Sequence, residues 1–223
     1  MILITRLQPG ADAFAREIKN NGLNAAVHPV MTVEFKPRPQ RLPETGEKLA
    51  FTSANGVRAF ASWTEDRAYE AFTVGDATAD CARQLGFKKV TSAQGNSDDL
   101  STLLKGEKNI VHIRGEHVSQ DMKCAREIIA YEAVPIPNVP QDLQQMLKDQ
   151  KFTSSTFFSP RTGQIFAELL QKIGAEQCCK DMVAVCISQK ASEAIDHLPW
   201  NRILIAEKPT QQEMLNLLLE ETT

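Results

Sequence analysis

Small polar residues recur where apolar runs give way to helical patterns. In LAFTSANGVRAF (49–60), the apolar run stops at Thr52 and Ser53, and Asn55 and Gly56 precede a helical pattern. A strand, small polar residues and then a helix is an arrangement in which backbone N–H groups bind an anion. The same residue types also cap helices, a contribution of about 1 kcal/mol each. Both interpretations stay open for Ser53.

The same pattern returns at other points in the chain. The candidate residues are Gly75 and Thr78 in VGDAT, Asn96 and Ser97 in GNSDDL, Ser159 in FFSP, Ser188 in ISQK and Thr210 in KPTQQE. Each alone is more typical of a helix cap, and Thr210 precedes Glu213 by the spacing of a capping box. Their number favours a ligand site, because open α/β sheets bind ligands at the carboxyl ends of their strands.

Two arginines and a tyrosine are further candidates. Arg6 and Arg114 each end an apolar run, in ITR and HIRG. They make either an ion pair within the protein or a clamp on a carboxylate, which suits a planar guanidinium. Tyr131, in AYEAVP, stands just before a proline-rich segment. Its ring packs there, or its phenol faces a cleft between lobes and donates a proton or a hydrogen bond.

Several chemistries lack their usual residues. The sequence contains no GxGxxG, GxxxxGK[ST] or GxSxG motif. The four histidines have no metal-ligand spacing, and none pairs obviously with an acid. The five cysteines include no CxxC pair, so we expect reduced thiols, with Cys81, Cys124 and Cys186 in packing roles. We therefore expect a ligand gripped by backbone N–H groups, hydroxyls and a few cations, without metal or cofactor.

The composition is that of an ordinary globular protein. The chain has 223 residues, of which 42% are hydrophobic and 24% charged, enough for one large or two small domains. The net charge of −3 argues against a nucleic-acid partner. MILIT at the N-terminus has no basic head, and no apolar segment reaches membrane length. We expect a cytoplasmic protein with no membrane contact.

Apolar runs alternate with helical patterns along the chain, which predicts α/β architecture with parallel sheets. The predicted strands are 2–5, 25–28, 49–52, 71–74, 89–92, 109–113, 155–158, 183–187 and 202–206. The predicted helices are 11–20, 56–63, 77–85, 98–104, 119–129, 162–173, 190–197 and 211–220. Two proline-rich segments, 35–48 and 134–141, break this alternation and indicate extended connectors at domain boundaries.

The chain also carries a weak internal duplication. FTSANGVRAFA (51–61) aligns with FFSPRTGQIFA (157–167), and VGDATADCARQL (74–85) with ISQKASEAIDHL (187–198). ILITR (2–6) aligns with IVHIR (110–114), and AREI occurs at both 15–18 and 125–128. The order of these matches predicts two similar lobes.

Taken in order, ILITR…GADAFA, FTSANGVRAF, VGDATADCARQLG, GNSDDL, IRG, YEAVP, FFSP and AEKPT resemble the uroporphyrinogen-III synthase family over nearly the whole chain. The resemblance implies two α/β lobes, each a parallel sheet flanked by helices, joined by a two-stranded connector. It places residues 1–34 and 137–223 in one lobe and 35–136 in the other, with the substrate cleft between them. Each half of the duplication is then split between the lobes.

The family cyclises hydroxymethylbilane, a linear tetrapyrrole polycarboxylate, to uroporphyrinogen III in haem biosynthesis. Water leaves, the last pyrrole ring is inverted and the macrocycle closes, without cofactor or metal. The resemblance thus implies a hydro-lyase that works by orientation and electrostatic preorganisation. We further expect a monomer that receives substrate by hand-over from hydroxymethylbilane synthase.

Resemblance also implies roles for particular residues. Tyr131 matches the tyrosine proposed to assist departure of the hydroxyl, and Ser188 and Ala191 stand where the family more often has glycine and threonine. The predicted substrate-binding residues are Arg6, Thr52, Ser53, Asn55, Gly75, Thr78, Asn96, Ser97, Arg114, Gly115, Ser159, Ser188 and Thr210. Two alternatives remain: a non-catalytic two-lobed protein that binds an anionic small molecule, and a duplicated scaffold that acts through protein partners.

Overall fold

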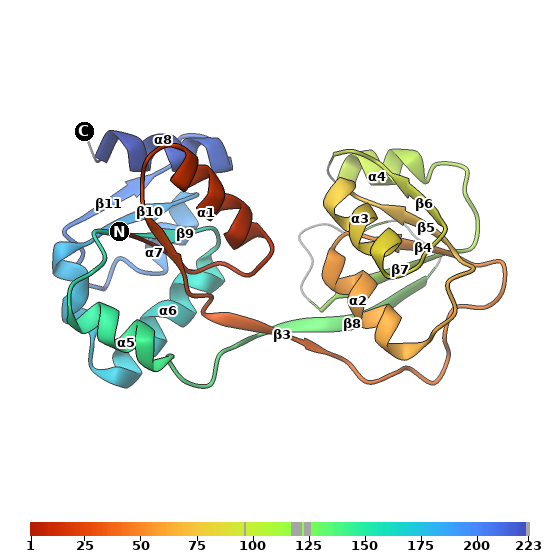
Figure 1. Ribbon diagram of the computed structural model, residues 1–223, viewed down its shortest axis with the longest axis horizontal. Coiled ribbons are helices and arrows are strands. Elements are labelled where there is room, and N and C mark those ends of the chain that lie inside the picture. The colour runs from red at the N-terminus through yellow and green to blue at the C-terminus, as the bar shows by residue number, and fades with distance from the viewer. Residues whose placement is uncertain (96, 117–121, 123–125, 222–223) are drawn as a thin grey trace. The chain divides into compact units, whose positions relative to one another are not determined.

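The computed structural model describes residues 1–95, 97–116, 122 and 126–221, and the chain divides into two units. The first unit comprises Met1–Thr32 and Pro135–Thr223, and the second comprises Val33–Val134. Each unit holds one sheet flanked by helices (Figure 1). The chain therefore starts in one unit, builds the other and returns.

The sheet of the first unit has five parallel strands in the order β11-β10-β9-β1-β2. Its strands are β1 (Ile2–Ile4), β2 (Ala25–Val27), β9 (Ser154–Phe157), β10 (Val183–Cys186) and β11 (Arg202–Ile205). Its helices are α1 (Gly10–Asn20), α5 (Gln141–Lys148), α6 (Pro160–Ile173), the 3-10 helix η1 (Glu176–Asp181), α7 (Gln189–Glu193) and α8 (Gln211–Glu221).

The second sheet has the order β3-β8-β7-β4-β5-β6, and its pairs from β8 to β6 are parallel. Its strands are β3 (Met31–Phe35), β4 (Lys48–Phe51), β5 (Glu70–Thr73), β6 (Lys89–Ser92), β7 (Ile110–Gly115) and β8 (Arg126–Pro135). Its helices are α2 (Ala54–Trp63), α3 (Asp76–Gln84) and α4 (Ser97–Leu103). Strands β3 and β8, which lead from one unit to the other, lie side by side (Figure 1).

The predicted α/β class with parallel sheets is confirmed, and all nine predicted strands form. The helix predicted over 119–129 is wrong where the structure describes it, because Arg126–Pro135 is strand β8; residues 119–121 and 123–125 lie outside the described residues. Pairing with β7 outweighs the helix propensity of this segment. The sequence patterns also missed β3, α5 and η1, and α7 ends at Glu193, short of the predicted 197.

The duplication is visible in the two strand orders. Strands β11-β10-β9-β1-β2 of the first sheet correspond to β6-β5-β4-β7-β8 of the second. The aligned segments 51–61 and 157–167 thus form a central strand and its following helix in each unit. The AREI match is a chance identity, because 15–18 is helical and Arg126–Ile128 is in a strand.

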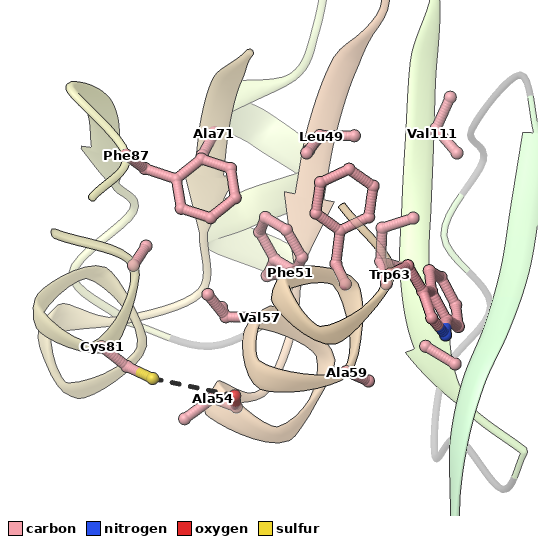
Figure 2. Packing of buried hydrophobic residues seen from close by; sticks show 14 residues of the cluster. Leu49, Phe51, Ala54, Val57, Ala59, Trp63, Ala71, Cys81, Phe87 and Val111 are labelled. Atoms are coloured by element: carbon pink, nitrogen blue, oxygen red, sulfur yellow. Dashed lines mark hydrogen bonds between the residues drawn. The ribbon is translucent and has the colours of Figure 1, made fainter. Parts of the chain in front are cut away.

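Aromatic rings fill the core of the second unit between the sheet and helices α2 and α3. Figure 2 shows Phe51 and Phe87 in this layer beside Val57 and Trp63, all at most 7% exposed. The Cys81 thiol, 3.8 Å from the carbonyl oxygen of Ala54, is buried in the same layer. This packing fixes α2 and α3 against the sheet, and so fixes their N-termini at its carboxyl edge.

Candidate active site

Four predicted residues lie at the carboxyl edge of the second sheet. Phe51 pairs with Thr73 on one side and with Ile113 on the other, and Ser53, Gly75 and Gly115 each come two residues after one of these paired positions. Gly115 itself pairs with Tyr131. The sheet register therefore brings the predicted catalytic tyrosine to the same edge as the cap of α2.

Gly115 makes room for the Tyr131 ring. A Cβ atom at residue 115 would lie 2.9 Å from ring carbons of Tyr131 and 3.1 Å from its hydroxyl oxygen. The ring is half-buried against the core of the second unit. Among the described residues, nothing forms a hydrogen bond with its hydroxyl, so packing orients the phenol and leaves its polar end free for a substrate.

Ser53 is the N-cap of α2, as one of the two interpretations of this segment predicts. Its extended backbone lets Oγ accept a hydrogen bond from the N–H of Asn55 at 3.2 Å. The Asn55 side chain in turn accepts a bond from Arg58. The N–H groups of Gly56 and Val57 bond to the Ser53 carbonyl oxygen, so within the described residues the cap leaves the N–H group of Ala54 for a ligand.

The other candidates in the second unit differ in how exposed they are. Gly75 is the N-cap of α3, whereas Thr78 lies in the first turn of that helix and is buried. Ser97 begins α4, and Asn96 lies outside the described residues. From the sequence we expected the Thr78 hydroxyl to be accessible at the sheet edge, but in the structure this residue is buried.

Three hydroxyls cap helices at the carboxyl edge of the first sheet. Ser159 accepts from the N–H of Thr162 at 3.1 Å, Ser188 from Ala191 at 3.4 Å, and Thr210 from Glu213 at 3.3 Å. The predicted caps are therefore present. They place three helix N-termini at one edge, where the partial positive charges favour an anion.

Arg6 lies at this same edge, without a carboxylate partner in the described part of the chain. Its guanidinium stacks over Phe158 at 4.2 Å and donates to the Gln211 side chain at 3.1 Å. It also touches the first turn of α1, since a Cβ atom on Gly10 would approach it to 2.6 Å. Burial lowers the Arg6 pKa, and a cation so placed favours an incoming anion.

Arg114, by contrast, is held within the second unit. Its Nε donates to Glu127 at 2.8 Å, and its Nη1 donates to the carbonyl oxygens of both Gly115 and Glu116. Of the two interpretations that the sequence leaves open for Arg114, the structure has the ion pair.

A histidine contacts an acid, contrary to the expectation from the sequence. His112 Nδ1 lies 3.6 Å from Glu127, and Nε2 lies 3.3 Å from the Thr52 hydroxyl. Sequence patterns missed this contact because Glu127 fell in a segment predicted to be helical. His112 and Arg114 are two residues apart on β7 and so share one strand face, which could have indicated a nearby acidic partner.

The described residues provide no candidate metal site and no candidate membrane span. They contain no group of three or more His, Cys, Asp or Glu side chains that fits a metal ion. None of their helices is long and apolar enough to cross a bilayer. Cys81, Cys178, Cys179 and Cys186 are free thiols, while Cys124 lies outside the described residues.

Comparison with known proteins decides the family. The model of the family described as uroporphyrinogen-III synthase HemD matches residues 12–216. The chain belongs to the uroporphyrinogen-III synthase family. This is a family of cyclising lyases in haem biosynthesis whose substrate is a tetrapyrrole, so the non-catalytic binding protein is not favoured.

Solved uroporphyrinogen III synthases from the bacterium Thermus thermophilus share the fold. A mutant form of that enzyme superposes with a TM-score of 0.51 at 15% identity, covering 99% of this chain and 98% of that one. The wild-type protein gives a TM-score of 0.48 at 15% identity, covering 100% and 99%. The two-lobed α/β class implied by the resemblance is confirmed.

Proposed function

We propose that this chain converts hydroxymethylbilane to uroporphyrinogen III through the groups at the carboxyl edges of its two sheets. Membership of the synthase family supports the reaction. The observation that carries the site is the pairing of Tyr131 with Gly115 at the edge where Ser53 caps α2. A phenol without a hydrogen-bond partner among the described residues thus lies at the same sheet edge as the N-terminus of α2.

Substrate carboxylates are bound by helix N-termini and by Arg6 in this proposal. Within the described residues, the caps of Ser188 and Thr210 leave the first two N–H groups of α7 and α8 for a ligand, and the cap of Ser53 leaves that of Ala54. Helix α6 begins with Pro160, which has no N–H group, so Ser159 offers its hydroxyl group instead. Arg6 adds a planar guanidinium whose desolvation strengthens its attraction for a carboxylate. A polycarboxylate needs several such contacts, and both units contribute them.

Tyr131 assists loss of the hydroxyl group from the substrate. Donation of the phenol proton to the leaving oxygen, as the carbon–oxygen bond breaks, releases water and leaves an electron-poor carbon conjugated with its pyrrole. The Tyr131 ring is held by Gly115 and the core, which fixes the direction from which the proton comes.

Ring inversion then depends on how the bound chain is oriented. Closure without inversion is the competing outcome, so the enzyme must hold the last ring with its substituted carbon facing the electron-poor carbon. Holding two reacting centres in contact is a large catalytic effect by itself. The contacts at both edges supply this constraint. We further propose that the enzyme is a cytoplasmic monomer that receives its substrate from hydroxymethylbilane synthase.

The test is to give the purified protein freshly prepared hydroxymethylbilane and to resolve the isomers. Type III product is expected from the proposed synthase. Formation of the type I isomer alone, at the spontaneous rate, would contradict the proposal. In that event, saturable binding of the linear tetrapyrrole would identify a binding protein, and its absence would leave a scaffold for protein partners.

A further inference from the structure

Four polar side chains form a chain across one face of the second sheet. Arg114 donates to Glu127 at 2.8 Å, Glu127 lies 3.6 Å from His112 Nδ1, and His112 Nε2 lies 3.3 Å from Thr52 Oγ1. The register explains the contact, because His112 pairs with Glu127 on β8 and with Ala50, two residues before Thr52, on β4. The chain ends at the predicted substrate-binding hydroxyl.

His112 is an unusual residue for its position. It is fully buried, and among the described residues its Nδ1 atom has no hydrogen-bond partner. Its neighbour Ala50 on β4 belongs to an apolar cluster that also includes Phe72 and Leu100. Burying an imidazole there costs free energy that a hydrocarbon side chain would not.

The first unit shows that the fold itself does not need these polar groups. In the duplicated pattern, Ile4 corresponds to His112 and Phe158 to Thr52. Val27, which pairs with Ile4, corresponds to Glu127. These three residues pack together in the core of the first unit. The same strand positions are therefore filled by apolar side chains in one unit and by a hydroxyl, an imidazole and a carboxylate in the other.

The surroundings of His112 select one of its two neutral tautomers. Burial, the largest cause, lowers the pKa of the ring, and this outweighs the opposing effect of Glu127, so the imidazole is neutral. The Glu127 carboxylate beside Nδ1 favours a proton on that nitrogen. Nε2 then carries a lone pair and accepts the hydrogen of the Thr52 hydroxyl.

We propose that His112 is a positioning residue that makes the Thr52 hydroxyl a hydrogen-bond acceptor toward the substrate. An oxygen whose only hydrogen is held by Nε2 repels a carboxylate and accepts from an N–H donor. Pyrrole N–H groups are the donors of a linear tetrapyrrole. Thr52 thus accepts hydrogen bonds from the pyrrole N–H groups, while the helix N-termini and Arg6 bind the carboxylates. This assignment rests on the proposed function for its ligand, but not for its tautomer.

The tautomer is measurable in the full-length protein without substrate. Two-bond nitrogen–proton correlation spectra of the ¹⁵N-labelled chain at neutral pH distinguish a protonated Nδ1 from a protonated Nε2. We expect His112 to show a protonated Nδ1 and a bare Nε2. Glu127→Gln should move the proton toward Nε2, because the carboxylate is gone. A protonated Nε2 in the wild-type chain would overturn the proposal, whatever the enzyme does.

A matched pair of substitutions tests the function of the contact. His112→Gln keeps a polar atom near Nε2 and can still meet Thr52, whereas His112→Asn keeps one near Nδ1 and cannot. We expect His112→Asn and Thr52→Val each to lower the rate of type III formation about tenfold, the value of one hydrogen bond. His112→Gln and Thr52→Ser should keep most of the rate, and His197→Gln, an exposed control, all of it.

The double variant gives the last readout. If His112 acts through Thr52, His112→Asn combined with Thr52→Val costs no more than either change alone. Additive losses, or equal losses from His112→Asn and His112→Gln, would contradict the positioning role. Failure of the wild-type chain to make type III product would instead refute the proposed function, and the tautomer measurement would still stand.

Discussion

Arg6 and Arg114 occupy equivalent places in the two units but have different surroundings. Arg114 is bound by Glu127 and two carbonyl oxygens, whereas Arg6 stacks on Phe158 and bonds to the neutral side chain of Gln211. Within the described residues Arg6 meets no carboxylate. The duplicated fold has therefore kept the guanidinium at both edges and satisfied its charge in only one of them.

The difference assigns separate tasks to the two edges. The second unit builds an internal polar chain that ends at Thr52 and sets Tyr131 beside Gly115. The first unit keeps Arg6, which has no carboxylate partner among the described residues, at the sheet edge that also carries three capped helix N-termini. On this account the first edge supplies most of the attraction for carboxylates, and the second supplies the chemistry.

The largest effect is expected from a substitution at Tyr131, in the unit that supplies the chemistry. Tyr131→Phe removes the phenol that donates to the leaving hydroxyl and should lower kcat about a hundredfold, the lower range for a general acid. Stability should change little, because the ring still packs on Gly115. Single-turnover kinetics measure the chemical step, and undiminished turnover would remove Tyr131 from the mechanism.

Arg6→Ala comes next and tests the carboxylate role of the first edge. Loss of a charge-assisted contact should weaken binding about ten- to a hundredfold, mainly in KM. Arg6→Lys is the matched control: it keeps the charge without the planar fork, so an intermediate KM is expected. A wild-type KM in Arg6→Ala would show that the two arginines do not differ as proposed.

Arg114→Ala should act on stability more than on KM. The change leaves Glu127 without its cation and should cost about 1–3 kcal/mol in the free energy of unfolding, measured in urea. Arg202→Ala breaks an exposed pair with Glu221 and should cost under about 1 kcal/mol. If Arg114→Ala instead leaves stability intact and raises KM, Arg114 is the carboxylate clamp.

Ser53→Ala should give the smallest effect, about 1 kcal/mol of stability from the lost cap. The substrate role adds weaker binding of the tetrapyrrole, which the cap role alone does not predict. Ser188→Ala makes the same cap change in the first unit. Stability and KM measured together for both variants separate the two roles at each edge.

The sequence predicted those parts of the molecule that depend on local pattern. Strands such as β1 and β4, and caps such as Ser53 and Ser159, follow from apolar runs that end in small polar residues. Their place at one edge follows from the parallel order of the strands. The internal duplication also predicted which segments of the two units correspond, and the strand orders of the two sheets agree with that prediction.

Local sequence patterns could not predict the contacts of β8. The sequence pattern around Arg126 and Glu127 predicted a helix, whereas pairing with β7 makes their segment a strand. The link from Glu127 to His112 depends on that pairing, so it was missed with it. The contrast between Arg6 and Arg114 was missed for a similar reason, since the partner of each guanidinium comes from elsewhere in the chain.

The most direct test of the account is the isomer composition of the product at increasing concentrations of this chain. At a fixed amount of fresh hydroxymethylbilane, the fraction of uroporphyrinogen III should rise with protein concentration until it exceeds the type I isomer. A product that stays type I at every concentration would contradict the account.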